Sequence, residues 1–144
     1  MKNHTVLRIA ILAAVLLSGS IAPATAAGLD APTELADWTL MVYIVGDNNL
    51  DEYVPLDIET ELAPTGSNAD VSVVALADRL PTAEWSQTLL FYVTQGMAAT
   101  PENAVADWGE ANMGDPQTLI DFIQWTQTNY PAEHYALSLW NHGW

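Results

Sequence analysis

The 144-residue sequence contains no cysteine and only three cationic residues, Lys2, Arg8 and Arg79. Without cysteine the chain can form no disulfide and offers no thiol as nucleophile or metal ligand. A secreted domain of this length can nevertheless be stable without disulfides, because its hydrophobic core is large enough. So few Lys and Arg residues cannot form the clusters that bind phosphate groups, and this excludes nucleic acid as a partner.

Long hydrophobic runs are also missing. The apolar run at Ile9–Leu17 has nine residues, too few to cross about 30 Å of hydrocarbon as an uncleaved membrane anchor. A basic start with Lys2 and Arg8 precedes this run, and the small-residue pattern Ala24-Thr25-Ala26 follows it. This order is typical of a secretory signal peptide. We predict a signal peptide over residues 1–27, a secreted protein (extracellular or periplasmic), and no membrane partner after cleavage.

Negative charge dominates the remainder. All 18 acidic residues follow residue 27, whereas Arg79 is the one cation there, so the formal charge of that part is −17. Three interpretations remain open: a solvated acidic surface suited to salty surroundings, attraction of basic substrates, and binding of calcium by paired carboxylates. No segment matches an EF-hand loop, so the sequence assigns no calcium ligands.

Strand-like and helix-like patterns alternate after an irregular leader at residues 28–37. Continuous apolar runs rich in β-branched and aromatic residues predict strands, and apolar residues at helical spacing predict helices. The order strand, helix, strand, strand, helix, strand favours an α/β fold with a sheet covered by helices. The second and third strands can pair antiparallel or lie in one mixed sheet. The strands are predicted over 38–45, 71–77, 88–94 and 134–140, and the helices over about 50–62 and 116–130.

The two helices differ in how clearly their ends are marked. Asp115 is a good N-cap for the second helix, Pro116 suits its first position, and Pro131 ends it. In the first helix Pro55 removes one backbone donor and clashes with the preceding turn. We therefore predict a kink there, or a helix that restarts at Pro55.

Polar clusters follow the first and last predicted strands, where ligands bind in open α/β sheets. The cluster after the last strand contains His142, whose imidazole can exchange protons near neutral pH. Gly143 would allow close approach of a substrate backbone, and Trp144 either lines a substrate cleft or packs in the core. The cluster after the first strand, Asp47-Asn48-Asn49, is interpreted as turn and capping residues.

A metal site that uses histidine ligands and serine-based hydrolysis are not supported. His134 is interpreted as a structural residue at the start of its strand, because no third ligand lies at a suitable spacing for a metal site with His142. No nucleophile elbow or His-Glu helix motif occurs. Ser138 lies in mid-strand and is a poor nucleophile candidate.

Several ordered segments resemble the clostripain (C11) family of cysteine peptidases. The opening strand and turn of the family resemble Trp38–Tyr43 and Gly46–Leu50. The start of its next core helix resembles Asn112–Leu119. Its histidine strand resembles Tyr130–Leu137 and Leu139–Gly143.

The resemblance implies a caspase-like α/β fold with a mostly parallel sheet flanked by helices. It also implies peptide-bond hydrolysis by a Cys–His dyad, with His142 as the catalytic histidine and proteins or peptides as substrates. In the family the cysteine follows the next parallel strand. Many members cleave after Arg or Lys, and calcium assists some of them.

The sequence departs from a complete enzyme of that kind. It contains no cysteine and stops two residues after His142, whereas a parallel crossover needs at least about a dozen residues. We therefore expect residues 38–144 to be the N-terminal part of a peptidase domain, with an incomplete sheet and no activity alone. The alternative is a non-catalytic, secreted acidic α/β domain that uses the same scaffold for binding.

Overall fold

A computed structural model describes residues 35–142 of the chain. The predicted signal peptide and most of the predicted leader lie outside this range, as do the proposed cleft residues Gly143 and Trp144. Within the described range no helix is both long and apolar enough to cross a membrane.

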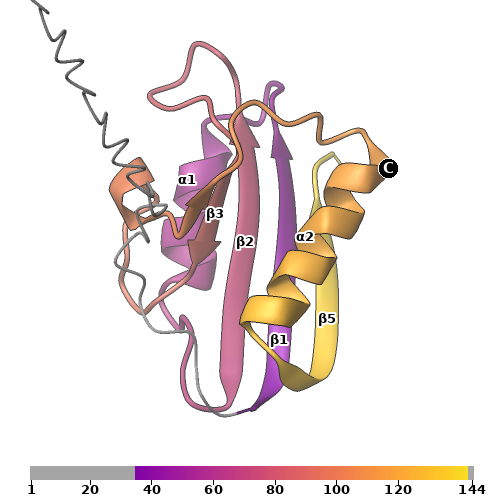
Figure 1. Cartoon of the computed structure of the whole chain (residues 1–144). Helices are drawn as coiled ribbons and strands as arrows, with labels where there is room; N and C mark the ends of the chain where they lie inside the picture. The colour runs from indigo at the N-terminus through magenta and orange to yellow at the C-terminus, as the bar shows by residue number, and fades with distance from the viewer. Residues whose placement is uncertain (1–34, 143–144) are drawn as a thin grey trace, which may run out of the picture.

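The centre of the molecule is a five-stranded sheet with the order β4-β3-β2-β1-β5 (Figure 1). Strand β1 pairs in parallel with β2 on one side and with β5 on the other, whereas β3 runs antiparallel to β2 and to β4. The sheet is therefore mostly parallel, as predicted, and the second and third predicted strands, β2 and β3, pair antiparallel within this one mixed sheet. The strands are β1 (Ala36–Gly46), β2 (Val71–Arg79), β3 (Leu89–Tyr92), β4 (Ala106–Asp107) and β5 (Ala132–Trp140).

Helices cover both faces of the sheet (Figure 1). Helix α1 (Tyr53–Asp57) continues directly into a π-helical turn, η1 (Ile58–Leu62), and both pack on one face. Helix α2 (Pro116–Asn129) packs on the other. A short 3₁₀ turn, η2 (Pro101–Asn103), lies in the long connection between β3 and β4.

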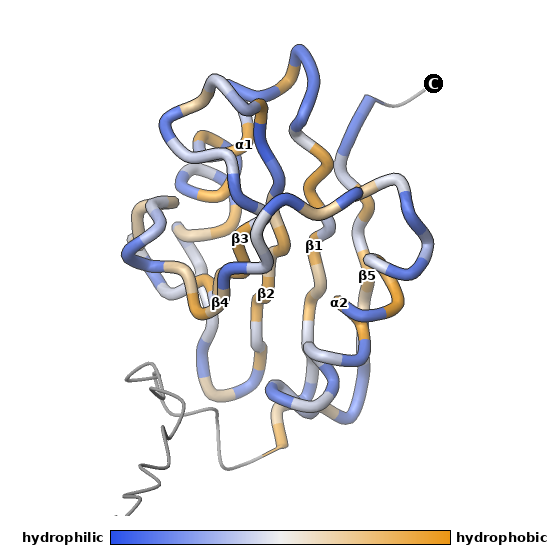
Figure 2. The backbone as a smooth tube through the Cα atoms, turned by 45° about the horizontal axis from the view of Figure 1, so that its top comes forward, coloured by the Kyte–Doolittle hydropathy of each residue, from blue (hydrophilic) through white to orange (hydrophobic). Residues whose placement is uncertain are grey.

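Alternation along the buried strands divides the core into two layers. Val42 and Ile44 of β1 face α1, whereas Met41 and Tyr43 face α2. Successive side chains of a strand point to opposite faces, so a strand that is apolar throughout can serve both layers. Figure 2 shows that apolar residues concentrate along β1 and β2, with hydrophilic residues in the loops around them.

The start of α2 confirms the predicted capping. The Asp115 carboxylate accepts a 2.9 Å hydrogen bond from the backbone N–H of Gln117, and Pro116 is the first helical residue. The predicted disruption at Pro55 is wrong in position. Because Pro55 falls in the first turn of α1, where backbone N–H groups lack intrahelical partners, it breaks no hydrogen bond. The irregularity occurs instead at Ile58, where α1 becomes the π-helical turn.

Strand β5 differs from its buried neighbours. Its side chains are mostly exposed or half-buried, with Leu137 at 42% and Leu139 at 65% exposure. In the part of the chain that the structure describes, β5 pairs only with β1, so its outer backbone edge lies at the border of the sheet. Among the described residues, the sheet is thus open along the outer edge of β5, the predicted histidine strand.

Candidate functional site

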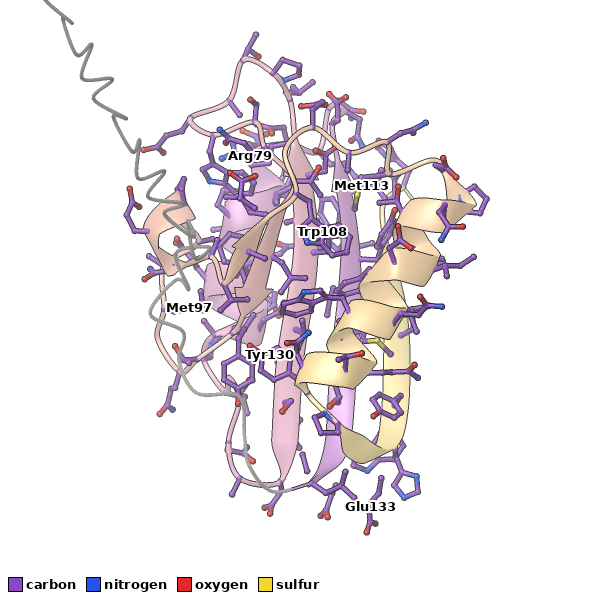
Figure 3. All side chains as sticks on the ribbon, viewed as in Figure 1. Arg79, Met97, Trp108, Met113, Tyr130 and Glu133 are labelled. Atoms are coloured by element: carbon purple, nitrogen blue, oxygen red, sulfur yellow. The ribbon has the colours of Figure 1, made fainter. Side chains whose placement is uncertain are left out.

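Three parallel strands, β1, β2 and β5, end at the same edge of the sheet, the edge formed by the carboxyl ends of the strands. The registers place Gly46 opposite Arg79 and Ile44 opposite Trp140, so the segments that follow these residues emerge side by side. Figure 3 shows Arg79 and Met113 at this edge and Glu133 at the opposite end. The strand order reverses at β1, because β2 lies on one side of it and the later β5 on the other. Such a reversal point is where ligands bind in open α/β sheets.

His142 lies at this reversal point, two residues after the end of β5, and its side chain is exposed. Its Nε2 atom is 2.9 Å from Oδ1 of Asn49, in the loop that follows β1. The backbone N–H of His142 donates a 2.6 Å hydrogen bond to Oδ1 of Asn141. The structure thus brings together the two polar clusters, which in the sequence are separated by the 93 positions between Asn49 and His142.

The two asparagines of the β1 loop have different roles. Asn48 holds the turn: its Nδ2 donates to the carbonyl oxygen of Val45, and its Oδ1 accepts from the N–H of Leu50, both at 2.8 Å. This confirms the predicted turn role for Asn48. Asn49 is exposed and directs its side chain to His142 instead. The turn and capping interpretation therefore missed the partner of Asn49, because a contact over this separation leaves no local pattern.

The end of β5 is fixed by a contact with helix α1. Nε1 of Trp140 donates a 2.8 Å hydrogen bond to Oδ2 of Asp57 in α1, and its half-buried ring packs against the α1-side core. His134 lies near the other end of β5, where its ring lies 4.8 Å from that of Trp38. His134 and His142 are eight positions apart along mostly extended chain, which corresponds to roughly 26 Å, so the two cannot share a ligand.

A second polar group at the same edge consists of three carboxylates. Asp47, Asp78 and Glu110 offer oxygen atoms that all lie within 4.8 Å of one another, and Asp78 is buried. Burial raises the pKa of Asp78 to about 6, and the charges of Glu110 and Asp47 act in the same direction, against the hydrogen bond from Thr88. The three carboxylates line a pocket of about 420 Å³ together with Val45 and residues 111–114.

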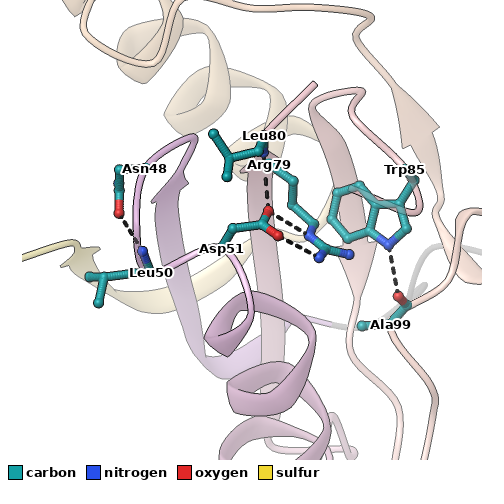
Figure 4. A network of polar contacts seen from close by, with 7 residues as sticks. All are labelled: Asn48, Leu50, Asp51, Arg79, Leu80, Trp85 and Ala99. Carbon is teal, nitrogen blue, oxygen red and sulfur yellow. Dashed lines mark hydrogen bonds and ion pairs between the residues drawn. The ribbon is translucent and has the colours of Figure 1, made fainter. Parts of the chain in front are cut away.

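Arg79 is engaged in structural contacts rather than open to a ligand (Figure 4). Its guanidinium donates two hydrogen bonds to the carboxylate of Asp51, at 2.9 and 2.8 Å, and its Cζ lies 4.9 Å from the centre of the Trp85 ring. The backbone N–H of Leu80 also donates to Asp51. Hydrogen bonding from Arg79 lowers the pKa of Asp51. The one Lys or Arg of the described residues is therefore neutralised by an ion pair at the edge that carries His142.

Comparison with known proteins adds sequence relationships. The family model described as "Clostripain family" matches residues 42–144. Clostripain from Hathewaya histolytica is 32% identical over 121 residues, an alignment that covers 73% of this chain. The chain spans 23% of the length of that relative.

Solved structures agree with the predicted fold class. A cysteine protease of B. fragilis superposes with a TM-score of 0.60 at 19% identity, covering 76% of this chain and 92% of that one. A secreted C11 cysteine protease from Bacteroides thetaiotaomicron, in complex with an irreversible peptide inhibitor, has a TM-score of 0.55 at 19% identity and covers 75% and 30% of the two chains. At these identities the likeness shows a shared fold.

Proposed function

Because the chain belongs to the clostripain (C11) family of cysteine peptidases, we propose that it supplies the histidine of a Cys–His dyad that hydrolyses peptide bonds. His142 is the proposed catalytic histidine, as the resemblance implied. The observation that carries the proposal is the position of His142: two residues after the end of β5, exposed, at the reversal point, and with Nε2 2.9 Å from Oδ1 of Asn49.

The chemistry follows from what an imidazole can do at that place. A neutral imidazole takes the proton of a thiol, so that the thiolate attacks the peptide carbonyl, and the imidazolium then protonates the leaving amine. The chain has no cysteine, so the thiol must come from a segment beyond this sequence. The open edge of β5 supports this assignment, because a further parallel strand there would end beside His142.

Protein or peptide substrates are proposed from the related structures, of which one holds an irreversible peptide inhibitor and another, a clostripain, also holds a peptide inhibitor. The acidic character of the sheet edge at the carboxyl ends of the strands supports a preference for substrates with basic side chains. Asp47, Asp78 and Glu110 lie there, and Arg79 is already paired with Asp51. A negative edge attracts cationic substrates over distances of about a Debye length. Cleavage after Arg or Lys therefore stays part of the proposal.

Secretion is proposed on two grounds. Residues 1–27 have the basic start, apolar run and small-residue site of a signal peptide. One related structure is described as a secreted C11 cysteine protease.

Calcium, which the family resemblance implied, is a separate proposal. Hard divalent cations take oxygen ligands, and Asp47, Asp78 and Glu110 provide carboxylate oxygens at a suitable mutual spacing among the described residues. Their chemistry fits such an ion. When bound, calcium would offset the repulsion that these carboxylates exert on one another.

The proposal is tested first in the coding sequence beyond Trp144. We expect an apolar strand that ends in cysteine within about one domain length, roughly 100 residues. The protein that includes this segment should cleave peptides after Arg or Lys, and His142→Ala should lower kcat by about 10² to 10⁴. The matched control, His134→Ala, should leave kcat unchanged. Full activity in His142→Ala would refute the proposal.

The alternative function is that of a non-catalytic, secreted acidic binding domain. A stop codon directly after Trp144, or a continuation without cysteine, would favour it, because His142 would then have no thiol to deprotonate. Binding of basic peptides that weakens with added salt, without cleavage, would be its expected signature.

A further inference from the structure

We infer that Asn49 is a positioning residue that fixes the tautomer and orientation of the His142 imidazole, leaving Nδ1 as the nitrogen that exchanges protons with the thiol. The inference rests on the proposed role of His142 and deepens it. It begins from one contact, the 2.9 Å separation between Nε2 of His142 and Oδ1 of Asn49.

The chemistry of the two atoms settles the direction of this hydrogen bond. Oδ1 is an amide oxygen and can only accept, so Nε2 must carry the hydrogen. The distance is typical of an N–H···O bond. A neutral imidazole carries a hydrogen on one nitrogen and a lone pair on the other, so the bond to Asn49 places the lone pair on Nδ1.

Asn49 is held in place by neighbours that leave its side chain free for this purpose. The Asn48 side chain makes the hydrogen bonds of the turn, to Val45 and Leu50, and the backbone adds bonds from Asn48 to Gly46 and from Asp51 to Asn48. At Gly46 an added Cβ would lie 2.5 Å from the carbonyl oxygen of Asp78 and against the Val54 side chain, so this close approach needs glycine.

The segment that carries the histidine is held by contacts of its own neighbours. Oδ1 of Asn141 accepts from the backbone N–H of His142 at 2.6 Å and lies 3.5 Å from Nδ2 of Asn48. Trp140, two residues earlier, is bonded to Asp57. Both partners of the bond between His142 and Asn49 are therefore carried by braced segments, and a bond between braced groups limits rotation of the ring.

An amide oxygen suits this role in a particular way. When His142 takes a proton, both ring nitrogens become donors, and Oδ1 of Asn49 continues to accept from Nε2. The ring keeps its orientation through both halves of the reaction. A carboxylate at this position would orient the ring equally well but would add a full negative charge, which would stabilise the imidazolium more strongly.

The first test needs no catalytic activity. In the 144-residue chain labelled with ¹⁵N-histidine, the ring ¹⁵N shifts at a pH where imidazole is neutral report the ratio of the Nε2–H to the Nδ1–H tautomer. We expect Asn49→Ala to lower this ratio for His142 by about three- to tenfold, the range that one hydrogen bond supports. Asn49→Asp, which keeps an acceptor, should preserve it.

Matched controls separate this effect from a general change in structure. Asn49 is exposed, so its replacement should leave the fold intact, and the ring signals of His134 should not move. Asn103→Ala removes an asparagine side chain that bonds to the Ala98 carbonyl, far from the site along the chain, and should leave the His142 ratio unchanged. An unchanged ratio in Asn49→Ala would overturn the inference.

Kinetics distinguish failure of the inference from failure of the proposed function. In the protein that includes the thiol segment, we expect Asn49→Ala to lower kcat by about ten- to hundredfold with little change in KM. Asn49→Asp should restore part of kcat with a shifted pH profile. Full activity of His142→Ala would reject the proposed function itself. Loss of activity in His142→Ala, combined with wild-type kcat in Asn49→Ala, would reject only the role of Asn49.

Discussion

Trp140 at the end of β5 is bound to Asp57 in helix α1 by a 2.8 Å hydrogen bond from its indole Nε1 to the carboxylate. The bond joins residues 83 positions apart and connects the strand that carries His142 to a helix on one face of the sheet. Because the outer edge of β5 has no strand beside it in the described residues, this bond and the pairing with β1 hold the end of the strand.

Removing this hydrogen bond between Trp140 and Asp57 should destabilise β5 selectively. We expect Asp57→Ala to reduce the free energy of unfolding by about 1 kcal/mol, because the half-buried indole N–H loses its acceptor. Native-state hydrogen exchange should speed up more at the end of β5 than in β2. Asp57→Asn keeps an acceptor and should restore most of the loss, and Glu61→Ala, at an exposed position of the adjacent turn, is the control. A uniform change across all strands would contradict this account.

The ion pair between Arg79 and Asp51 should protect the chain from trypsin. After residue 27, Arg79 is the one residue at which trypsin can cut, and its side chain is 9% exposed and bonded twice to Asp51. We expect the native protein to resist cleavage at Arg79 and Asp51→Ala to be cut there at least several times faster. Glu52→Ala, at the next position, should remain resistant. Rapid cleavage of the unaltered protein at Arg79 would show that the pair does not hold this loop.

The same pair should contribute to acid sensitivity. The pKa of Asp51 is lowered by its bonds to Arg79, so the folded state favours the ionised carboxylate. This contribution to stability is present above the unfolded value of 3.8 and is lost as the pH falls below it. Thermal unfolding measured over a series of pH values should therefore show that stability falls less steeply below pH 3.8 in Asp51→Ala than in the unaltered protein.

Asp78 should have the opposite effect on the way the stability of the fold depends on pH. Its pKa is raised from 3.8 to about 6, so the fold favours the neutral carboxyl, and a cost appears as the pH rises between these two values. A tenfold change in proton affinity corresponds to about 1.4 kcal/mol, so the full cost above pH 6 is at most about 3 kcal/mol, and solvent screening reduces it further. We expect Asp78→Asn, which keeps an acceptor for Thr88, to be more stable than the unaltered protein above pH 7 and similar to it near pH 4. Parallel stability curves for the two proteins would contradict this prediction.

Calcium should reverse part of that cost. If the ion binds Asp47, Asp78 and Glu110, it stabilises the folded state according to its concentration relative to Kd. We expect millimolar Ca²⁺ to raise Tm and Glu110→Gln or Asp47→Asn to abolish the increase. Glu52→Gln removes the same charge elsewhere on the exposed surface and should retain it. Equal Tm shifts in all variants would show nonspecific screening instead of a site.

Local signals in the sequence were enough to predict the main strands and the second helix. The apolar runs that became β1 and β2 are long and buried on both faces, and the pair Asp115-Pro116 marks a helix start by its own chemistry. Strand β4 was not predicted, because a two-residue strand has no periodicity to detect. The direction in which β3 pairs with β2 depends on tertiary contacts, so two arrangements were equally compatible with the sequence.

The candidate site was predictable only in part. His142 could be singled out because it follows a strand at the edge where ligands bind, and because its segment resembles a known family. Its partner Asn49 and the approach of Glu110 to Asp78 both join residues far apart in the sequence. Such contacts follow from the order of the strands and from loop paths, neither of which is encoded in any single segment.

The neutralisation of Arg79 also determines how copies of this protein interact. With the one Lys or Arg of residues 35–142 tied to Asp51, the described surface has no strongly positive region to attract the carboxylates of another copy. Mutual repulsion therefore opposes pairing through the apolar outer edge of β5 at low ionic strength, and salt weakens this repulsion once the Debye length falls below about 10 Å. Raising the ionic strength of the medium should therefore favour association between copies of this protein.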